Sequence, residues 1–289
     1  MGAGLNNHHW PIQGIAFPGC LKELHVKPTT GGHVKSRHVT SRHEFEICLL
    51  CNRGLLKVSM WIHRALFVLV VAASGTAFGG QNPYLTNQQL DIIPFMPAPV
   101  VNGSAEDRAQ QALVMAAQKA ATPERIVLAN SDAEETVYAM FSTVVGPQFK
   151  AVNLPILTAM FERIGETEDA VVDPVKAYFG RTRPFLNNPE IKPLVKPSKS
   201  GSYPSGHTSR STMMAVILSS MLPESRTSIF VRANEYAESR VIGGMHYPND
   251  LEAGRRAGSA MAATLLASPT FRTDFEASKA ELRRVLGLR

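Results

Sequence analysis

Residues 201–222 read GSYPSGHTSRSTMMAVILSSML, and the pattern of this stretch indicates the fold class most clearly. Within 208–222 the apolar residues recur every three or four positions, in two stripes that start at Met213 and Met214. That period is helical, and a double stripe predicts a helix that is buried on more than one face. The preceding Pro204-Ser205-Gly206 is typical of a turn before a helix. We therefore expect a core helix here.

Helical patterns also lie on both sides of this stretch. They predict helices over residues 104–121, 131–144, 155–164 (ended by Gly165), 229–242, 251–267 and 271–286. Gly254, Gly258 and Ala262 share one face of the 251–267 helix, which allows close packing. Long alternating runs of β-branched residues are missing, and the proline-rich residues 81–103 predict an extended surface leader. The sequence thus predicts an all-α fold, a single compact helical domain over residues 80–289.

Charge is distributed unevenly along the 289 residues, which carry a formal net charge of +6. From Gly80 onward, 22 Lys and Arg stand against 21 Asp and Glu, so the basic excess belongs to the N-terminal stretch. We therefore expect no nucleic-acid partner. All three cysteines lie before residue 60. Cys48 and Cys51 have CxxC spacing, but no second ligand pair accompanies them, so we expect no metal site there.

Residues 60–79 read MWIHRALFVLVVAASGTAFG. A short basic start, a brief apolar run and a tail of small residues are the build of a secretory signal peptide. The alternatives are an uncleaved anchor or a buried strand. We interpret Met60 as the true start and residues 1–59 as a non-native or disordered extension, which N-terminal sequencing of the precursor tests. The expected location is periplasmic or secreted, with no integral membrane domain after signal cleavage.

Three motifs carry the chemistry of the domain. They read KAYFGRTRP at 176–184, GSYPSGHT at 201–208 and SRVIGGMHYPND at 239–250. Taken singly, each has a structural explanation: surface charges, a turn before a helix, or a hydrogen-bonded pair. Taken together, they indicate one site for an anion.

Cations and backbone N–H groups form the first half of that site. Lys176, Arg183 and Arg240 can bind the oxygens of a tetrahedral anion. Ser205 and Gly206 stand at the start of the expected core helix, where free N–H groups favour an anion.

Two histidines form the second half. Asp250 follows His246 by four residues, and its carboxylate can accept the Nδ1–H and leave Nε2 free as a nucleophile. His207 can then protonate a leaving group. This is phosphoryl transfer without a metal. Asp173 and Glu252 are further carboxylates that the sequence does not exclude from the site.

The order Lys-x6-Arg-Pro, Pro-Ser-Gly-His and Ser-Arg-x5-His-x3-Asp resembles the type 2 phosphatidic acid phosphatase and vanadium haloperoxidase superfamily. The string at 201–208 is similar to the signature of bacterial class A non-specific acid phosphatases, and the resemblance covers roughly residues 82–280. It implies a helical, exported, metal-independent enzyme that needs no cofactor and takes small phosphomonoesters; it also allows a homo-oligomer. It implies that His246 forms a phosphohistidine, Asp250 orients it, His207 is the proton donor, and the phosphate is held by Lys176, Arg183, Ser205, Gly206 and Arg240.

Other functions stay open at this point. A vanadium-dependent haloperoxidase would use the same cradle, but the short body of about 210 residues and the 201–208 string argue against it. A non-catalytic phosphate-binding protein would not need His207, His246 and Asp250 together. A membrane-embedded lipid phosphatase is disfavoured, since no apolar stretch after residue 80 is long enough to span a bilayer. We expect an exported acid phosphatase that hydrolyses soluble phosphomonoesters through a phosphohistidine.

Overall fold

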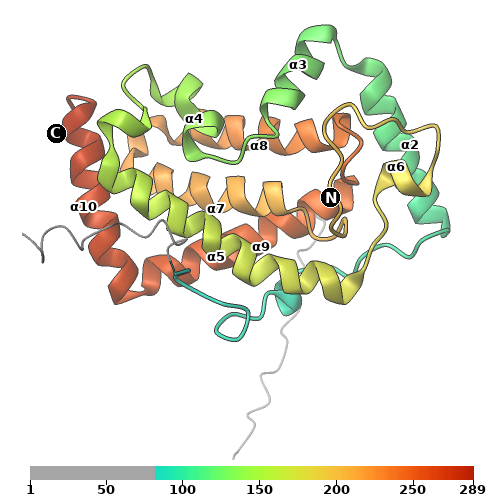
Figure 1. Ribbon diagram of the computed structural model, residues 1–289, viewed down its shortest axis with the longest axis horizontal. Coiled ribbons are helices and arrows are strands. Elements are labelled where there is room, and N and C mark those ends of the chain that lie inside the picture. The colour runs from blue at the N-terminus through green and yellow to red at the C-terminus, as the bar shows by residue number, and fades with distance from the viewer. Residues whose placement is uncertain (1–81) are drawn as a thin grey trace, which may run out of the picture. The chain divides into compact units, whose positions relative to one another are not determined.

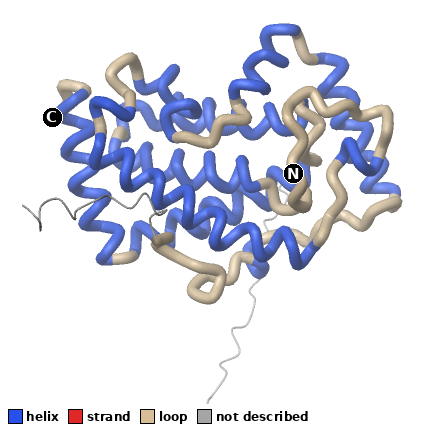
Figure 2. Tube along the Cα trace, in the orientation of Figure 1, coloured by secondary structure: helices blue, strands red, loops and turns tan. Residues whose placement is uncertain are grey.

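The computed structural model describes residues 82–289, and every regular element in that range is a helix (Figures 1 and 2). The α-helices are α2 (Ala105–Ala120), α3 (Pro123–Ser131), α4 (Val137–Val145), α5 (Pro155–Phe179), α6 (Pro184–Asn187), α7 (Gly206–Met221), α8 (Arg226–Ile242), α9 (Pro248–Ala267) and α10 (Pro269–Val285). Short 3-10 helices are η1 (Ile93–Phe95), η2 (Ala151–Asn153) and η3 (Pro223–Ser225). The all-α prediction is confirmed. The predicted extension (1–59) and signal peptide (60–79) lie outside the described residues.

Helix α7 lies at the centre of the helical layers and packs against α5, α8 and α9 (Figure 1). Both predicted stripes are buried: Met213, Met214, Ile217 and Leu218 are each at most 1% exposed. Burial on most of its faces explains why a helix of such mixed composition is stable, because tertiary packing supplies what local propensity does not. The prediction of a core helix is confirmed.

Small residues bring α7 and α9 into close contact. A Cβ on Gly254 would lie 2.7 Å from the carbonyl oxygen of Ser205, and one on Gly258 would lie 2.4 Å from that of Ser209. Real Cβ atoms do not approach so closely, so only glycine permits this spacing. The predicted role of these glycines is confirmed, and the contact holds the first turn of α7 against the second and third turns of α9.

The predicted helix over residues 131–144 is wrong. Helix α3 already ends at Ser131, and α4 begins at Val137 with Thr136 as its N-cap. Between them the carboxylate of Asp132, which is 2% exposed, binds the guanidinium of Arg232 and accepts a 2.6 Å hydrogen bond from Ser239 Oγ. A buried carboxylate needs such partners, and reaching them draws the chain out of helical geometry. The loop that results carries the next residues toward α7.

The expected end of the 155–164 helix at Gly165 is also wrong. Helix α5 continues through Gly165 and Pro174 and ends at Gly180, whose left-handed φ of 57° is typical of a helix C-terminus. Gly165 has a packing role instead: a Cβ there would lie 3.3 Å from Arg210 Nη1. The extension places Lys176 in the last turn of α5, next to the start of α7.

The proline-rich leader is irregular apart from η1, as expected, but it is anchored rather than merely superficial. Ile92 is fully buried. The Tyr84 hydroxyl donates a 2.6 Å hydrogen bond to Asp274 of α10, and its backbone N–H donates a 2.8 Å bond to Thr167 of α5. The leader therefore ties α5 to α10.

Candidate active site

Residues from all three motifs meet at one cavity of about 220 Å³. It is bounded by the C-terminal turn of α5, the first turn of α7, the last turn of α8 and the loop before α9. The lining residues are Glu135, Glu168, Asp169, Asp173, Lys176, Arg183, Ser198, Ser200, Gly206, His207, Arg240 and His246. Segments that are up to 111 residues apart in the chain thus supply one small polar chamber.

The ring of His246 is held with one nitrogen free of its proton. Its Nδ1 lies 2.8 Å from the carbonyl oxygen of Ser202, which can only accept, so Nδ1 carries the hydrogen. Its Nε2 lies 3.1 Å from Arg183 Nη1, which can only donate. Burial lowers the pKa of His246, and the cations Arg183 and Arg240 lower it further. The result is a neutral imidazole with a lone pair on Nε2.

Asp250 acts on this ring less directly than its spacing predicts. Its Oδ2 is 3.4 Å from Nδ1 of His246, so the Ser202 carbonyl is the nearer acceptor. The carboxylate accepts hydrogen bonds of 2.5 Å from Ser202 Oγ, 2.9 Å from the Tyr247 N–H and 2.5 Å from Arg181 Nη1. Burial raises the pKa of Asp250 to about 6 against the opposing effect of Arg181. The Asp250 carboxylate therefore links Ser202, whose carbonyl group binds the His246 ring, to Tyr247, the residue that follows His246.

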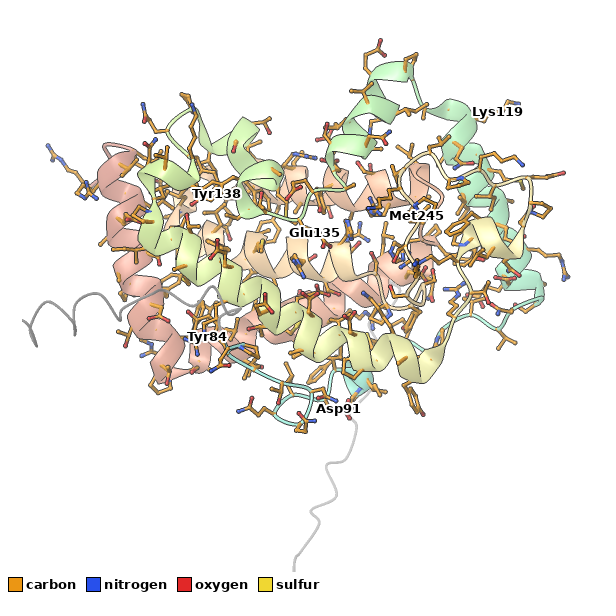
Figure 3. The ribbon with its side chains drawn as sticks, viewed as in Figure 1. Tyr84, Asp91, Lys119, Glu135, Tyr138 and Met245 are labelled. Atoms are coloured by element: carbon orange, nitrogen blue, oxygen red, sulfur yellow. The ribbon has the colours of Figure 1, made fainter. Side chains whose placement is uncertain are left out.

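His207, in the first turn of α7, has a partner that sequence reasoning missed. Glu135, on the loop that leads into α4 and labelled in Figure 3, places Oε1 2.8 Å from Nδ1 of His207. The ring also stacks on Tyr236, with centroids 5.9 Å apart. Its Nε2 is buried and has no partner in the described part of the chain. No spacing rule connects residues 135 and 207, because only the break between α3 and α4 brings the carboxylate here.

Charge around His207 acts in both directions. Burial lowers the pKa of His207 below its usual value, and Arg240 adds to this, whereas Glu135 opposes the shift without reversing it. For Glu135, burial alone would raise the pKa, but the hydrogen bond from His207 and the charges of His207 and Arg210 lower it to about 2. Glu135 is therefore an anion at every working pH, and it favours the protonated form of the imidazole.

Arg240 is the clearest sign of an anion-binding site. It is 3% exposed, and its Nε and Nη1 are buried without a hydrogen-bond acceptor among residues 82–289. Burial lowers the pKa of this guanidinium. Donors that are buried and unpaired are costly, so they are expected where a ligand satisfies them.

Lys176 and Arg183, the other two predicted anion-binding cations, already have partners in the protein. Lys176 Nζ is 3.1 Å from Asp173 Oδ1 and lines the cavity. Arg183 donates to the carbonyl oxygens of Ser200, Gly201 and Met245. These bonds fix the guanidinium at the cavity wall.

Ser205 and Gly206 have different roles at the start of α7. Ser205 Oγ accepts hydrogen bonds from the Thr208 N–H at 3.3 Å and from Thr208 Oγ1 at 2.9 Å, and the Ser205 N–H donates to the Asp250 carbonyl. Ser205 is thus the N-cap and does not line the cavity. Gly206 does line it, and the first N–H groups of α7 have no partner within the helix.

Of the two carboxylates left open by the sequence, Asp173 belongs to the cavity and Glu252 does not. Glu252 lies on α9 and pairs with Arg256 at 2.7 Å on the surface. Asp173 faces the cavity and holds Lys176. Within residues 82–289 there is no cluster of His, Cys, Asp and Glu suited to a metal ion. In the same range no helix combines the length and apolarity needed to cross a membrane.

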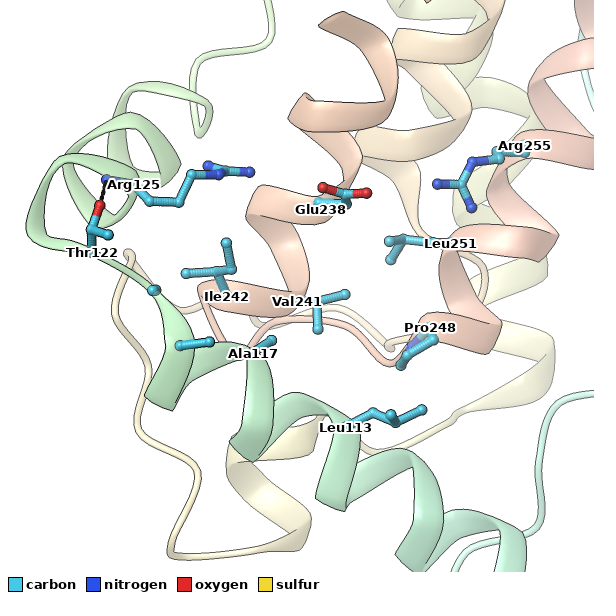
Figure 4. A pocket seen from close by; sticks show the side chains of 12 residues that line it. Leu113, Ala117, Thr122, Arg125, Glu238, Val241, Ile242, Pro248, Leu251 and Arg255 are labelled. Atoms are coloured by element: carbon cyan, nitrogen blue, oxygen red, sulfur yellow. Dashed lines mark hydrogen bonds between the residues drawn. The ribbon is translucent and has the colours of Figure 1, made fainter. Parts of the chain in front are cut away.

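A larger cavity of about 680 Å³ lies elsewhere, between α2, α8 and α9 (Figure 4). Its walls are mainly apolar, including Leu113, Val241 and Leu251, with Arg125 and Arg255 at its edge. It contains none of the predicted site residues. We therefore place the chemistry in the smaller polar chamber, where titratable groups converge.

Comparison with known proteins identifies the family. The PAP2 superfamily model matches residues 157–274, the range that holds all three motifs. The chain is 32% identical over 214 residues to a non-specific acid phosphatase of Providencia stuartii, covering 70% of this chain and 85% of that protein. It is 34% identical over 153 residues to a non-specific acid phosphatase of Salmonella typhi, covering 51% of this chain and 61% of that one.

Two weaker matches extend the comparison. An acid phosphatase of Zymomonas mobilis is 30% identical over 167 residues, covering 55% of this chain and 63% of the relative. A solved transmembrane PAP2 type phosphatidylglycerolphosphate phosphatase from Bacillus subtilis is 19% identical with a TM-score of 0.43, covering 72% of this chain and 92% of that one. That structural likeness is too low to bear on function. From the motifs, the chamber that they build and the relatives, we conclude that the chain belongs to the acid phosphatases of the PAP2 superfamily.

Proposed function

We propose that this acid phosphatase hydrolyses soluble phosphomonoesters by transferring the phosphoryl group to His246. The observation that supports this most directly is the group of buried polar atoms without partners around one chamber: Nε2 of His207 with Nε and Nη1 of Arg240. A bound phosphate would give acceptors to all of them. The neutral Nε2 of His246 opens on the same chamber.

In the first step, Nε2 of His246 attacks phosphorus and forms a P–N bond while the P–O bond to the leaving group breaks. The proton on Nε2 of His207 passes to the leaving oxygen, so that an alcohol departs. The phosphate oxygens accept hydrogen bonds from Nε and Nη1 of Arg240 and from N–H groups at the start of α7. They also accept from the Nη1–H of Arg183 that His246 releases when its Nε2 bonds to phosphorus. These fixed charges stabilise the transferred group where negative charge accumulates.

In the second step, water attacks phosphorus and the P–N bond breaks. The water proton passes to His207, which restores the donor, and inorganic phosphate leaves. Ser202 keeps the hydrogen of His246 on Nδ1 throughout, so Nε2 is again the free nitrogen. No step in this scheme requires a metal.

The test is hydrolysis of p-nitrophenyl phosphate in excess EDTA by the parent protein and its His246→Ala variant. We expect the parent to be active and the variant to lose activity while still binding sulfate. A phosphoenzyme that survives base and is lost in acid would identify a phosphohistidine. Glu252→Gln is the matched control, since this carboxylate lies on the surface of α9. Turnover by His246→Ala would exclude the mechanism.

We also propose that the enzyme is exported. The support is the signal-peptide pattern of residues 60–79. Expression of residues 60–289 from the Met60 start in a Gram-negative host, followed by fractionation and N-terminal sequencing, tests this. Active protein in the periplasm that starts near residue 80 is expected, and uncleaved protein in the cytoplasm would contradict export. The homo-oligomer stays a prediction, which light scattering can test.

A further inference from the structure

One acidic side chain of the chamber has no part in the chemistry above. Glu168, on α5, is 2% exposed and lines the chamber. Its Oε2 accepts hydrogen bonds from Arg210 Nε at 3.1 Å and Nη2 at 2.9 Å. Its Oε1 is buried with no partner in the described part of the chain. A buried carboxylate oxygen without a donor is costly, so Oε1 requires a proton or a ligand.

That oxygen borders the corner where an anion would bind. A Cβ placed on Gly206 would lie 3.1 Å from Oε1 of Glu168 and 2.7 Å from Nζ of Lys176. Because residue 206 is glycine, this corner stays open. It is shared by a carboxyl group, an ammonium group and the N-terminal N–H groups of α7. An oxyanion there would meet all three.

Charged groups from three elements face this carboxyl group. Burial raises the pKa of Glu168, Arg210 and Lys176 lower it, and Asp169 and Glu135 raise it again, with a result of about 7. Lys176 and Asp169 belong to α5, Arg210 to α7, and Glu135 to the loop before α4. The other titratable groups that line the chamber are Asp173, Arg183, His207, Arg240 and His246.

We propose that Glu168 is a phosphate ligand that binds only in its protonated form, with its Oε1–H donating a hydrogen bond to a phosphate oxygen. The proposal rests on the phosphate site described above. As a carboxylate, the same group would face the anion with two lone pairs and a negative charge. Anion binding therefore takes up a proton at this residue, and affinity falls as pH rises through the pKa of Glu168. This would link substrate binding to acidity separately from the proton donor His207.

Sulfate is a suitable probe because its own charge does not change near neutral pH. We would measure its Kd by isothermal titration calorimetry on the purified protein at about pH 6 and about pH 8. With a free-state pKa of about 7, the Glu168 contribution should raise the wild-type Kd about tenfold across this interval. Glu168→Gln keeps an N–H donor but cannot titrate. The increase in its Kd between about pH 6 and about pH 8 should therefore be smaller than that of the wild type by a factor of about ten. Glu166→Gln, an exposed acid on the same helix, should behave as the wild type.

Two results would overturn the proposal. One is that Glu168→Gln keeps the full pH dependence of the wild type. The other is that Glu168→Gln, shown by circular dichroism to be folded, fails to bind sulfate at about pH 6, which would mean that the negative charge itself is needed.

A measurement on the wild type alone gives an independent test. Titrations in buffers of different ionisation enthalpy count the protons taken up with sulfate, and uptake near zero at about pH 7.5 would also refute the proposal. None of these readouts needs turnover. Failure of the phosphohistidine mechanism would instead appear as activity in His246→Ala, so the two failures are distinguishable.

Discussion

Replacing Glu135 by glutamine tests how His207, the proposed proton donor, is held. Glutamine can still accept the Nδ1–H of His207 across 2.8 Å, but it lacks the charge that favours the imidazolium. A hydrogen bond to a charged group contributes about 1 to 1.5 kcal/mol more than a neutral one. The Glu135 side chain is 35% exposed, so solvent screening favours the lower end, about 1 kcal/mol. That corresponds to about a fivefold loss of rate and to a fall of just under one unit in the pKa of His207.

The assay is kcat/KM against pH for an alkyl phosphate and for p-nitrophenyl phosphate. An alkoxide leaves poorly and needs the proton of His207, whereas nitrophenolate is a stable anion. We expect about a fivefold loss for the alkyl phosphate and little loss for the aryl one. Because His207 loses its proton at a lower pH in the variant, the decline of kcat/KM at high pH should begin at a lower pH than in the parent protein. Glu134→Gln, its exposed neighbour, is the control. Equal losses of kcat/KM on both substrates, with an unchanged pH profile, would show that Glu135 does not support proton donation by His207.

Three further outcomes follow from the geometry. Gly258→Ala should lower the free energy of unfolding by about 1 to 3 kcal/mol in urea titrations, because its Cβ would sit 2.4 Å from the Ser209 carbonyl oxygen. Gly206→Ala should raise the Kd for sulfate about tenfold or more with little change in Tm, because its Cβ would displace the flexible Lys176 ammonium, 2.7 Å away, from the anion corner. Stability should also depend on Glu168: its folded pKa of about 7 lies above the ordinary 4.5, so its contribution is complete below about pH 4.5 and is lost as pH rises through 7. Urea titrations at pH 5 and 7.5 should therefore show a smaller difference for Glu168→Gln than for the wild type.

Much of the architecture could be predicted because its causes are local. The double stripe at 208–222 needs burial on two faces wherever it folds, and it became the central α7. The glycine face of 251–267 needs a close neighbour, and α7 is that neighbour. Where the helix predictions failed, a tertiary contact outweighed the local pattern. The buried pair of Asp132 and Arg232 interrupts one helix, and the packing of Gly165 against Arg210 lets another continue.

The active site also combines features that local sequence predicts with features that depend on tertiary contacts. The two histidines, the three cations and the phosphatase class follow from the amino-acid sequence alone, since these residue types stand in ordered motifs with fixed spacing. That the carbonyl of Ser202 is the nearest acceptor for the His246 ring, and that Glu135 binds His207, is visible only in the folded molecule. The fold also brings the buried Glu168 to the anion corner. These contacts join residues that are 38 to 72 positions apart, and no local periodicity encodes which polar groups must satisfy one another once water is excluded.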